Sequence, residues 1–331
     1  MTTNQQSKRV LMFCAGFFGY EKRIADAIRS QGHAVDLYDE RPNSGFVAKA
    51  CIRYNIGLYQ SAIRKYYKRL IEKGNNNPYD YVLVVKGEAV TEEIVKMLRA
   101  GYPNAKFVLY LWDSVANTPD CVNRMKLYDQ VFTFDPEDAK KYQIEYLPIP
   151  YDEDSFSYTT CDTYKYDAAF IGTAHSVRPR VVKQIQQICR QQNRTMFVYF
   201  YSPHILVYLF NKLTNPDYKW ITRKDVNFKP LSSAQVYEIY ANSRCVLDIE
   251  HPKQSGATTR PIEMLAMKKK IISTNRHVVE FPFYNDSNFC VVQRDAVEID
   301  RDFWERPYID VDDDIMQRYS PERFAQMLIG E

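Results

Sequence analysis

The stretch HPKQSGATTRPIEMLAMKKKIIST, residues 251–274, decides the fold expected for this chain of 331 residues. An apolar run at 245–249 precedes it and predicts a buried strand. A loop with one glycine follows, and a helix is expected from about Pro261, because proline suits the first helical turn. The run 271–274 predicts a return to strand, so the stretch makes one βαβ unit. The lysines at 268–270 are expected to close the helix with positive charge, which is favourable at a helix C-terminus.

The loop and the start of this helix carry features of an anion site. Gly256, Thr258 and Thr259 are small, and a helix N-terminus reached by such a loop offers N–H groups and the positive end of a dipole. Arg260 can hold a phosphate in two-pronged fashion. Glu263, expected on the first turn, can accept hydrogen bonds from a sugar diol. The alternative is an ordinary βαβ unit in which Glu263 is a capping carboxylate.

The order of small residues, R-x-x-E-M-L-A, a basic turn and I-I-S-T resembles the donor-binding block of GT-B glycosyltransferases. The resemblance is nearest to the CgeB-like and polysaccharide-assembly members, is good over 251–274 and is loose elsewhere. It implies that Glu263 contacts the ribose of a nucleotide sugar and that the loop and helix start face the diphosphate. Ser255 stands where many retaining members carry a second glutamate, so the anomeric outcome stays open.

Composition narrows the class of protein. Hydrophobic residues at 45% and charged residues at 26% are typical of a soluble globular chain, and the length suits two domains. A net charge of +3 is too small to indicate a nucleic-acid-binding protein. No apolar run approaches the ~20 residues of a membrane span, and no secretory signal is visible, so a cytoplasmic protein is expected. The seven cysteines show no metal spacing and predict free thiols, with neither a metal nor a cofactor.

Strand and helix patterns alternate along the chain. Near-continuous apolar runs such as 81–85 and 107–111 are typical of a buried parallel sheet. We therefore expect an α/β protein with two doubly wound, Rossmann-like domains facing a cleft. The predicted parts are an acceptor domain at 1–150, a linker at 151–166, a nucleotide-sugar domain at 167–300, and a tail at 301–331. Ser320 and Pro321 predict the start of a final helix, which the resemblance implies crosses back to the first domain.

Further donor-side candidates surround the first strand of the second domain. The resemblance implies that this strand end and the following helix face the donor phosphates, through Gly172, Thr173, His175, Arg178 and Arg180. The alternative is a plain β–α turn with surface arginines. His251 and Lys253 follow the strand predicted at 245–249. A cation there would support a leaving diphosphate without a metal; the alternative is a polar loop that faces solvent.

Acceptor-side candidates lie in the first domain. The turn with Gly16, Phe17 and Gly19 follows the first strand and, by the resemblance, lines the acceptor side; a plain turn is the alternative. Glu88 and Asp113 each follow a strand, where a carboxylate can remove the proton of an acceptor hydroxyl. The alternatives are that Asp113 caps the next helix and that Glu88 pairs with Lys86.

The segment 46–71 is basic and amphipathic. Its apolar residues recur at helical spacing, it holds no acid, and its cations are Lys49, Arg53, Arg64, Lys65, Lys68 and Arg69. Such a helix suits contact with anionic lipid or a polyanionic acceptor. The alternative is a domain helix with a solvated basic face.

Together these features predict a metal-independent glycosyltransferase, cytoplasmic and in peripheral contact with the inner face of the membrane. It would move a sugar from a nucleotide-sugar donor to a glycan or lipid-linked glycan during surface polysaccharide assembly. A nucleotide-sugar epimerase and a non-catalytic sugar-nucleotide-binding subunit are the alternatives. The donor sugar and base, the acceptor and the linkage stay open.

Overall fold

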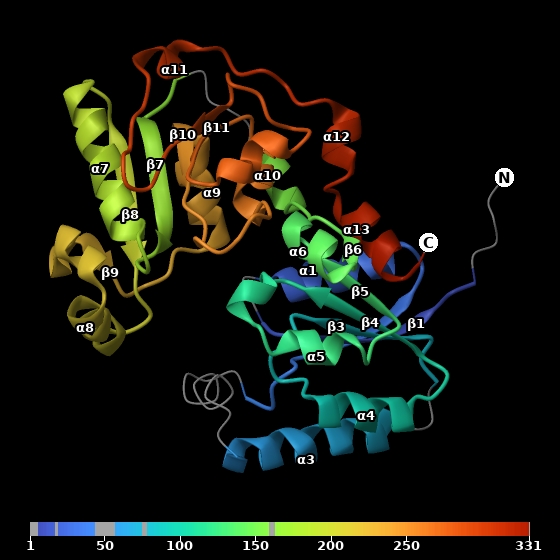
Figure 1. The fold of residues 1–331 in the computed structure, drawn as a ribbon. Helices are drawn as coiled ribbons and strands as arrows, with labels where there is room; N and C mark the ends of the chain where they lie inside the picture. Colours follow the sequence, from blue (N-terminus) through green and yellow to red (C-terminus); the bar gives the residue numbers. More distant parts are fainter. Residues whose placement is uncertain (1–5, 17–18, 44–56, 75–77, 159–162, 331) are drawn as a thin grey trace. The chain divides into compact units, whose positions relative to one another are not determined.

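The computed structural model describes residues 6–16, 19–43, 57–74, 78–158 and 163–330. The chain divides into two compact units: unit 1 comprises 1–149 and 318–331, and unit 2 comprises 150–317. Each unit is built on its own parallel sheet of six strands with helices on both faces (Figure 1). This confirms the predicted α/β fold of two doubly wound, Rossmann-like domains, which is the GT-B architecture.

The sheet of unit 1 has the order β2-β1-β3-β4-β5-β6. From β1 the chain moves to β2 on one side, and from β3 onward it moves to the other side. The gap between β1 and β3 is therefore the topological switch point, where ligands bind outside the carboxyl ends of the strands in open α/β sheets. The strands are β1 (Arg9–Cys14), β2 (Ala34–Tyr38), β3 (Tyr81–Val85), β4 (Lys106–Leu111), β5 (Gln130–Thr133) and β6 (Glu145–Tyr146).

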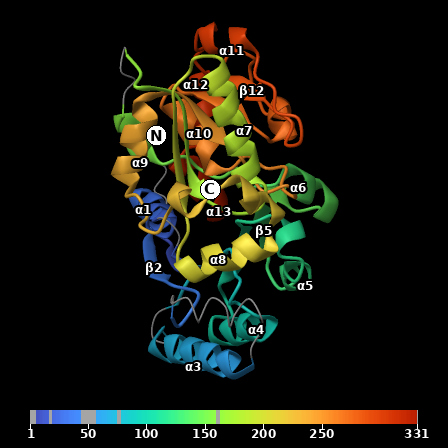
Figure 2. The ribbon, with the colours of Figure 1, turned by 90° about the vertical axis from the view of Figure 1, so that its left-hand side faces the viewer.

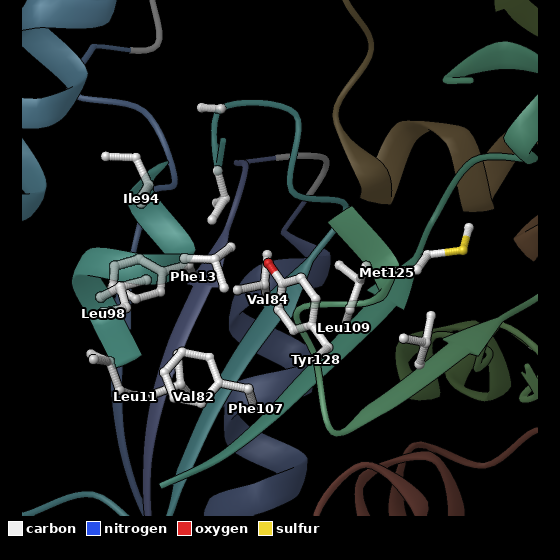
Figure 3. Packing of buried hydrophobic residues seen from close by; sticks show 14 of the residues in the cluster. Leu11, Phe13, Val82, Val84, Ile94, Leu98, Phe107, Leu109, Met125 and Tyr128 are labelled. Atoms are coloured by element: carbon white, nitrogen blue, oxygen red, sulfur yellow. The ribbon is translucent and has the colours of Figure 1, made fainter. Parts of the chain in front are cut away.

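Helices cover both faces of this sheet because its central strands are apolar on both sides. α3 (Gly57–Gly74) and α4 (Glu92–Gly101) lie on one face, and α1 (Tyr20–Ser30) lies on the other (Figure 1). Alternate residues of β1 point to opposite cores: Leu11 and Phe13 pack toward α3 and α4 (Figure 3), and Val10 and Met12 pack toward α1. The shorter helices are η1 (Val115–Asn117), α5 (Cys121–Met125) and α6 (Pro136–Tyr142).

The last helix, α13 (Pro321–Leu328), belongs to unit 1 although it follows unit 2 in sequence. Ser320 is its N-cap and accepts a hydrogen bond from the N–H of Arg323 at 3.1 Å, and Pro321 stands in the first turn, as predicted. Phe324 and Leu328 are buried in the core shared with α1, and burial of each contributes roughly 1.5–3 kcal/mol. The helix therefore returns to the first unit, as the resemblance implies.

The sheet of unit 2 has the order β12-β11-β10-β7-β8-β9. The first strand, β7, lies beside β10, and the chain winds outward in opposite directions from this pair. The switch point of unit 2 therefore lies between β7 and β10. The strands are β7 (Tyr166–Thr173), β8 (Met196–Tyr201), β9 (Val226–Asn227), β10 (Ser243–Asp248), β11 (Lys270–Ser273) and β12 (Phe289–Val291).

In unit 2, α7 (Arg178–Gln191) lies on one face of the sheet, and α9 (Ser233–Ala241) and α10 (Thr259–Ala266) lie on the other (Figure 1, Figure 2). α7 packs on a core that includes the fully buried Trp304 of α11 (Arg301–Glu305). The remaining helices are η2 (Glu153–Ser157), α8 (Ile205–Thr214), η3 (Pro216–Trp220), η4 (Arg223–Asp225), η5 (Arg276–Glu280) and α12 (Asp313–Gln317).

The structure corrects two predictions about 251–274. α10 begins at Thr259, so Pro261 is its third residue, and α10 ends at Ala266, before the lysines. The buried Lys269 donates to the carbonyl of Ala241 at 2.6 Å, and Lys270 belongs to β11 and donates to the carbonyls of Phe303 and Arg306. The prediction that these lysines close α10 is therefore wrong. The chain turns into β11 within a few residues, so the ammonium groups of Lys269 and Lys270 satisfy carbonyls of other segments, and that of Lys268 pairs with Asp310 at 2.8 Å.

The cysteines that the structure describes are free, as predicted. Cys14, Cys121, Cys189 and Cys245 are buried and Cys290 is partly exposed, whereas Cys51 and Cys161 lie outside the described residues. None of the described helices is both long enough and apolar enough to cross a membrane.

Candidate functional site

The switch point of unit 2 brings together two of the predicted donor-side residues, Arg178 and Arg260. Arg178 begins α7 and its Nε donates to the carbonyl of Ile249, just after β10, at 2.8 Å. Arg260 on α10 donates through Nη2 to the carbonyl of Ile171 in β7 at 2.9 Å and through Nη1 to that of Leu247 in β10 at 3.2 Å. The two guanidinium groups thus tie together the ends of the two strands that flank the switch point. None of the hydrogen bonds among the described residues uses Nη2 of Arg178.

Arg178 and His175, which both lie at this edge of the sheet, differ in charge at neutral pH. Burial and the neighbouring Arg260 lower the pKa of Arg178 to about 10, so Arg178 stays protonated at neutral pH. Burial, Arg178 and His251 lower the pKa of His175 to about 3, so its imidazole is neutral there. Nδ1 of His175 lies 3.0 Å from Oγ of Ser176. The positive charge at this edge therefore comes from the arginines, and His175 contributes an uncharged polar group.

Both helices that start at the switch point lack a side-chain cap. Val177 precedes α7 and has no capping side chain. Thr258 precedes α10, but its hydroxyl donates to Oδ1 of Asp248 at 3.3 Å and does not accept a hydrogen bond from a helix N–H. By contrast, Ser232 and Ser320 cap α9 and α13 with their hydroxyls. The first-turn N–H groups of α7 and α10 are therefore not taken up by cap side chains, which suits an anionic ligand.

Glu263 is the fifth residue of α10 and lies in its second turn, one turn later than predicted, because the helix begins at Thr259. Its side chain is buried, and its charge interacts with Arg260 and with the hydroxyl of Tyr240. An interior helical position excludes the alternative in which Glu263 caps the helix. Its role as the ribose contact stays a prediction.

Two other donor-side candidates have structural partners. Gly172 lies inside β7, and a Cβ added there would stand 2.9 Å from Cζ of Phe170, so a larger residue must displace that ring. Arg180 donates through Nε to Asp217 at 2.9 Å and forms a second ion pair with Asp295 at 2.9 Å. These contacts account for both residues without a ligand, and their contact with a phosphate stays a prediction.

Two buried carboxylates near the site were missed from the sequence. Asp248 ends β10, and its pKa is raised by burial against the opposing effect of Arg260 and Arg178. Glu250 accepts a hydrogen bond from Thr274 at 2.6 Å and pairs with Arg294, and burial together with Asp248 raises its pKa to about 7. Their signal in the sequence is an acid at the end of an apolar strand, the same signal that identified Asp113.

In unit 1 the structure brings the two predicted base candidates together around one lysine. Nζ of Lys86 lies 3.0 Å from Oδ2 of Asp113 and 3.3 Å from Oε1 of Glu88. Lys86 and Gly87 both have positive φ, 74° and 71°, so the chain turns sharply after β3 and returns its side chains to the sheet edge. Burial lowers the pKa of Lys86, but the two carboxylates raise it by more, and the net shift is upward. The Lys86–Glu88 pair, which is the alternative to a base role for Glu88, is present. The alternative in which Asp113 caps the next helix is wrong, because Ser114 is the N-cap residue of η1.

Glu40, two residues after β2, is a further carboxylate that sequence reasoning missed. It is fully buried, and neither of its oxygens has a hydrogen-bond partner among the described residues. Burial and the nearby Glu88 raise its pKa to about 7, against the effect of Arg41 and Lys86. Glu40 therefore belongs electrostatically to the Lys86 cluster.

The turn after β1 lies at the same switch point. Gly19 is the N-cap residue of α1 with φ +84°, a conformation that residues with a side chain rarely adopt. A Cβ added at Gly16 would stand 3.8 Å from Oδ2 of Asp39, in ordinary contact. Phe17 lies outside the described residues. Contact of this turn with an acceptor stays a prediction.

The described part of the basic segment is α3. The cations Arg64, Lys65, Lys68 and Arg69 are exposed, and Lys49 and Arg53 lie outside the described residues. Ile63 and Tyr67 of α3 are buried in the core of unit 1. The apolar face of α3 therefore serves its own unit, and its exposed face is polar. Across the described ranges, no group of three His, Cys, Asp or Glu side chains is placed to hold a metal ion.

Comparison with known proteins supports the fold. No protein-family model and no curated protein sequence matches the chain. Sucrose-phosphate synthase from Thermosynechococcus elongatus has a TM-score of 0.62 and 8% identity over 97% of this chain and 95% of that chain. HepE from Anabaena, in complex with UDP and glucose, has a TM-score of 0.60 and 10% identity over 98% of both chains. UDP-GlcNAc 2-epimerase from Methanocaldococcus jannaschii has a TM-score of 0.55 and 12% identity over 98% of this chain and 100% of that chain. At these identities the similarity establishes the fold alone.

Proposed function

We propose that this protein is a glycosyltransferase that binds a nucleotide-sugar donor at the switch point of unit 2 and an acceptor at that of unit 1. The observation that carries the proposal is at the switch point between β7 and β10. Arg178 and Arg260 lie there, and so do the N-termini of α7 and α10, neither of which has a side-chain cap. Fixed N–H groups and guanidinium charge suit a diphosphate. Glu263, one turn into α10, supplies the acceptor oxygens that a ribose diol requires.

A uridine nucleotide is the first donor to test. HepE is described in complex with UDP and glucose, and with UDP-glucose, and the Methanocaldococcus epimerase with UDP-GlcNAc and UDP. Their shared architecture supports, for this chain, a nucleotide sugar of that class. An acceptor glycan or lipid-linked glycan in polysaccharide assembly is proposed from the resemblance to the CgeB-like and polysaccharide-assembly members.

The chemistry needs stabilisation of a leaving diphosphate and removal of a proton from the acceptor hydroxyl. Arg178 and the dipoles of α7 and α10 are fixed before reaction and stabilise the developing negative charge, so a metal-independent reaction is proposed. In unit 1, Asp113 or Glu88 takes the proton as the hydroxyl oxygen attacks the anomeric carbon. Lys86 is ion-paired with both carboxylates and holds them at the same edge of the sheet.

The exposed cations of α3 suit an anionic acceptor. Among residues 59–74 of α3, no large hydrophobic side chain is exposed, so charge contact is favoured over insertion into a bilayer. Charge reversal of Arg64 and Lys68 should then raise the KM for the acceptor and leave donor affinity unchanged.

A nucleotide-sugar epimerase is the second candidate, because epimerases share this fold. An epimerase converts the donor alone, whereas a transferase requires an acceptor. Proton NMR of the sugar nucleotide, incubated with the protein with and without acceptor, separates the two. A binding subunit would leave the donor unchanged in both samples.

The donor site is tested by calorimetric titration with UDP, GDP, CDP and dTDP and their sugar derivatives. Glu263→Ala should weaken binding of the preferred nucleotide by about 10- to 100-fold, because hydrogen bonds to a charged group are lost. Glu298→Ala, at an exposed position of the same unit, is the matched control. Equal affinity of both variants and of the wild type would remove Glu263 from the site.

A further inference from the structure

The helix α8 of unit 2 presents an apolar face to solvent. Twelve large hydrophobic residues are exposed in the described part of the chain, and five of them fall within α8. Leu213 is 87% exposed, Leu206 66% and Phe210 63%. With Ile205 and Leu209 they follow the spacing i, i+1, i+4, i+5 and i+8, which places them along one face of a helix.

The opposite face of α8 carries the polar contact. Lys212 turns toward the protein, and its Nζ donates to the carbonyls of Tyr218 and Ile221, each at 2.7 Å. Tyr208 is buried on the same face. The usual arrangement of a surface helix is therefore inverted, since a lysine head is held on the protein side while the leucines face outward. An exposed apolar patch of this kind marks a surface that contacts another apolar phase.

The charges around this face identify the partner. The segment 215–229 follows α8, and its two acids are neutralised within the unit: Asp217 pairs with Arg180 at 2.9 Å and Asp225 pairs with Lys183 at 2.5 Å. The exposed cations Lys219, Lys224 and Lys229 form no ion pair among the described residues. Trp220, at the end of η3, which packs against α8, is 36% exposed.

We propose that α8 and the segment 215–229 form a docking surface for an anionic lipid bilayer. The apolar side chains enter the boundary between headgroups and acyl chains, and the free lysines contact anionic headgroups. α8 follows the carboxyl end of β8, so the surface lies at the same edge of the sheet as the loops after β7 and β10 (Figure 1, Figure 2). The inference is independent of which reaction the switch points support, since it rests on the surface of α8 alone.

The test is co-sedimentation of the full chain with vesicles of phosphatidylcholine, with and without roughly 30% phosphatidylglycerol, an anionic lipid that gives the vesicle a negative surface potential. The wild type should bind the anionic vesicles. Leu209→Gln with Phe210→Gln and Leu213→Gln should weaken binding by about 100-fold or more, since each buried apolar side chain contributes about tenfold. Replacement of Lys219, Lys224 and Lys229 by Gln should weaken binding to anionic vesicles by about 100-fold. Replacement of Lys126, Lys140 and Lys141 by Gln, three exposed lysines of unit 1, is the matched control and should change binding less than fivefold, about the effect of one cation near the surface.

A direct measurement keeps the test independent of folding. Acyl chains labelled with bromine should quench Trp220, whereas the buried Trp304 should be unaffected. An unchanged far-UV circular dichroism spectrum shows that the variants are folded. The proposal is overturned if the wild type does not bind anionic vesicles, or if the α8 variant binds as well as the wild type. It is also overturned if light scattering shows a dimer that the α8 substitutions dissociate while vesicle binding is absent, because α8 is then an interface between two copies.

Discussion

Glu40→Gln should remove a pH-dependent loss of stability from unit 1. The carboxyl group of Glu40 is fully buried, without a hydrogen-bond partner among the described residues, and burial with the nearby Glu88 raises its pKa from 4.5 to about 7. Between these two values the unfolded chain releases the proton while the folded chain keeps it, so the free energy of unfolding falls as pH rises. The loss begins above pH 4.5 and levels off above pH 7. The gap between the two values corresponds to about 3 kcal/mol when the carboxylate is fully charged.

Glutamine keeps the size of the side chain and does not titrate. The stability difference between variant and wild type should therefore shift in favour of the variant by about 3 kcal/mol between pH 4.5 and pH 8. Hydrogen exchange measured by mass spectrometry on peptides from β1 and β3 reports the opening of unit 1, and peptides from β7 and β10 provide the internal control. A difference between the two proteins that stays constant over this pH range would show that Glu40 titrates normally and would refute the reasoning.

Three further predictions concern the two switch points. Arg260→Ala should lower turnover more than Arg260→Lys, and both should be impaired, because a planar guanidinium bridges the carbonyls of Ile171 and Leu247 and an ammonium does not; steady-state kinetics with full activity in both variants would make Arg260 dispensable. One of Asp113 and Glu88 is expected to be the base: its amide variant, Asp113→Asn or Glu88→Gln, should lower kcat by about 100-fold or more, and the amide variant of the other residue should lower kcat by less than about tenfold; if both variants keep full kcat, the base lies elsewhere. Transfer should persist after exhaustive chelation, because fixed cations and helix dipoles carry the charge of the leaving group; activity lost on chelation and restored by magnesium or manganese would contradict this.

Much of the fold could be read from local sequence. Apolar runs such as 81–85 and 107–111 predict buried parallel strands, and these strands are observed as β3 and β4 with at most one residue of difference. Ser320 and Pro321 predict the start of α13 because a cap hydroxyl and a proline act on the backbone next to them. Such signals depend on neighbours along the chain, so one sequence is sufficient to see them.

The sites depended on the tertiary structure. Lys269 and Lys270 look like a helix terminus in sequence, yet they satisfy carbonyls of Ala241 and Phe303, which are distant along the chain. Likewise, the pairing of Lys86 with Glu88 is local, but only the register of β3 beside β4 brings Asp113 to the same lysine.

The sequence by itself determined the two α/β units, the order of their elements and the loops at which ligands are expected, because these follow from hydrophobic periodicity and local backbone preference. Only the tertiary structure decided which arginines bridge β7 and β10, why Glu40 and Glu250 hold raised pKa values, and that α8 turns its leucines outward. Burial and charge at a residue are sums over neighbours from distant segments, and those neighbours are assigned by folding.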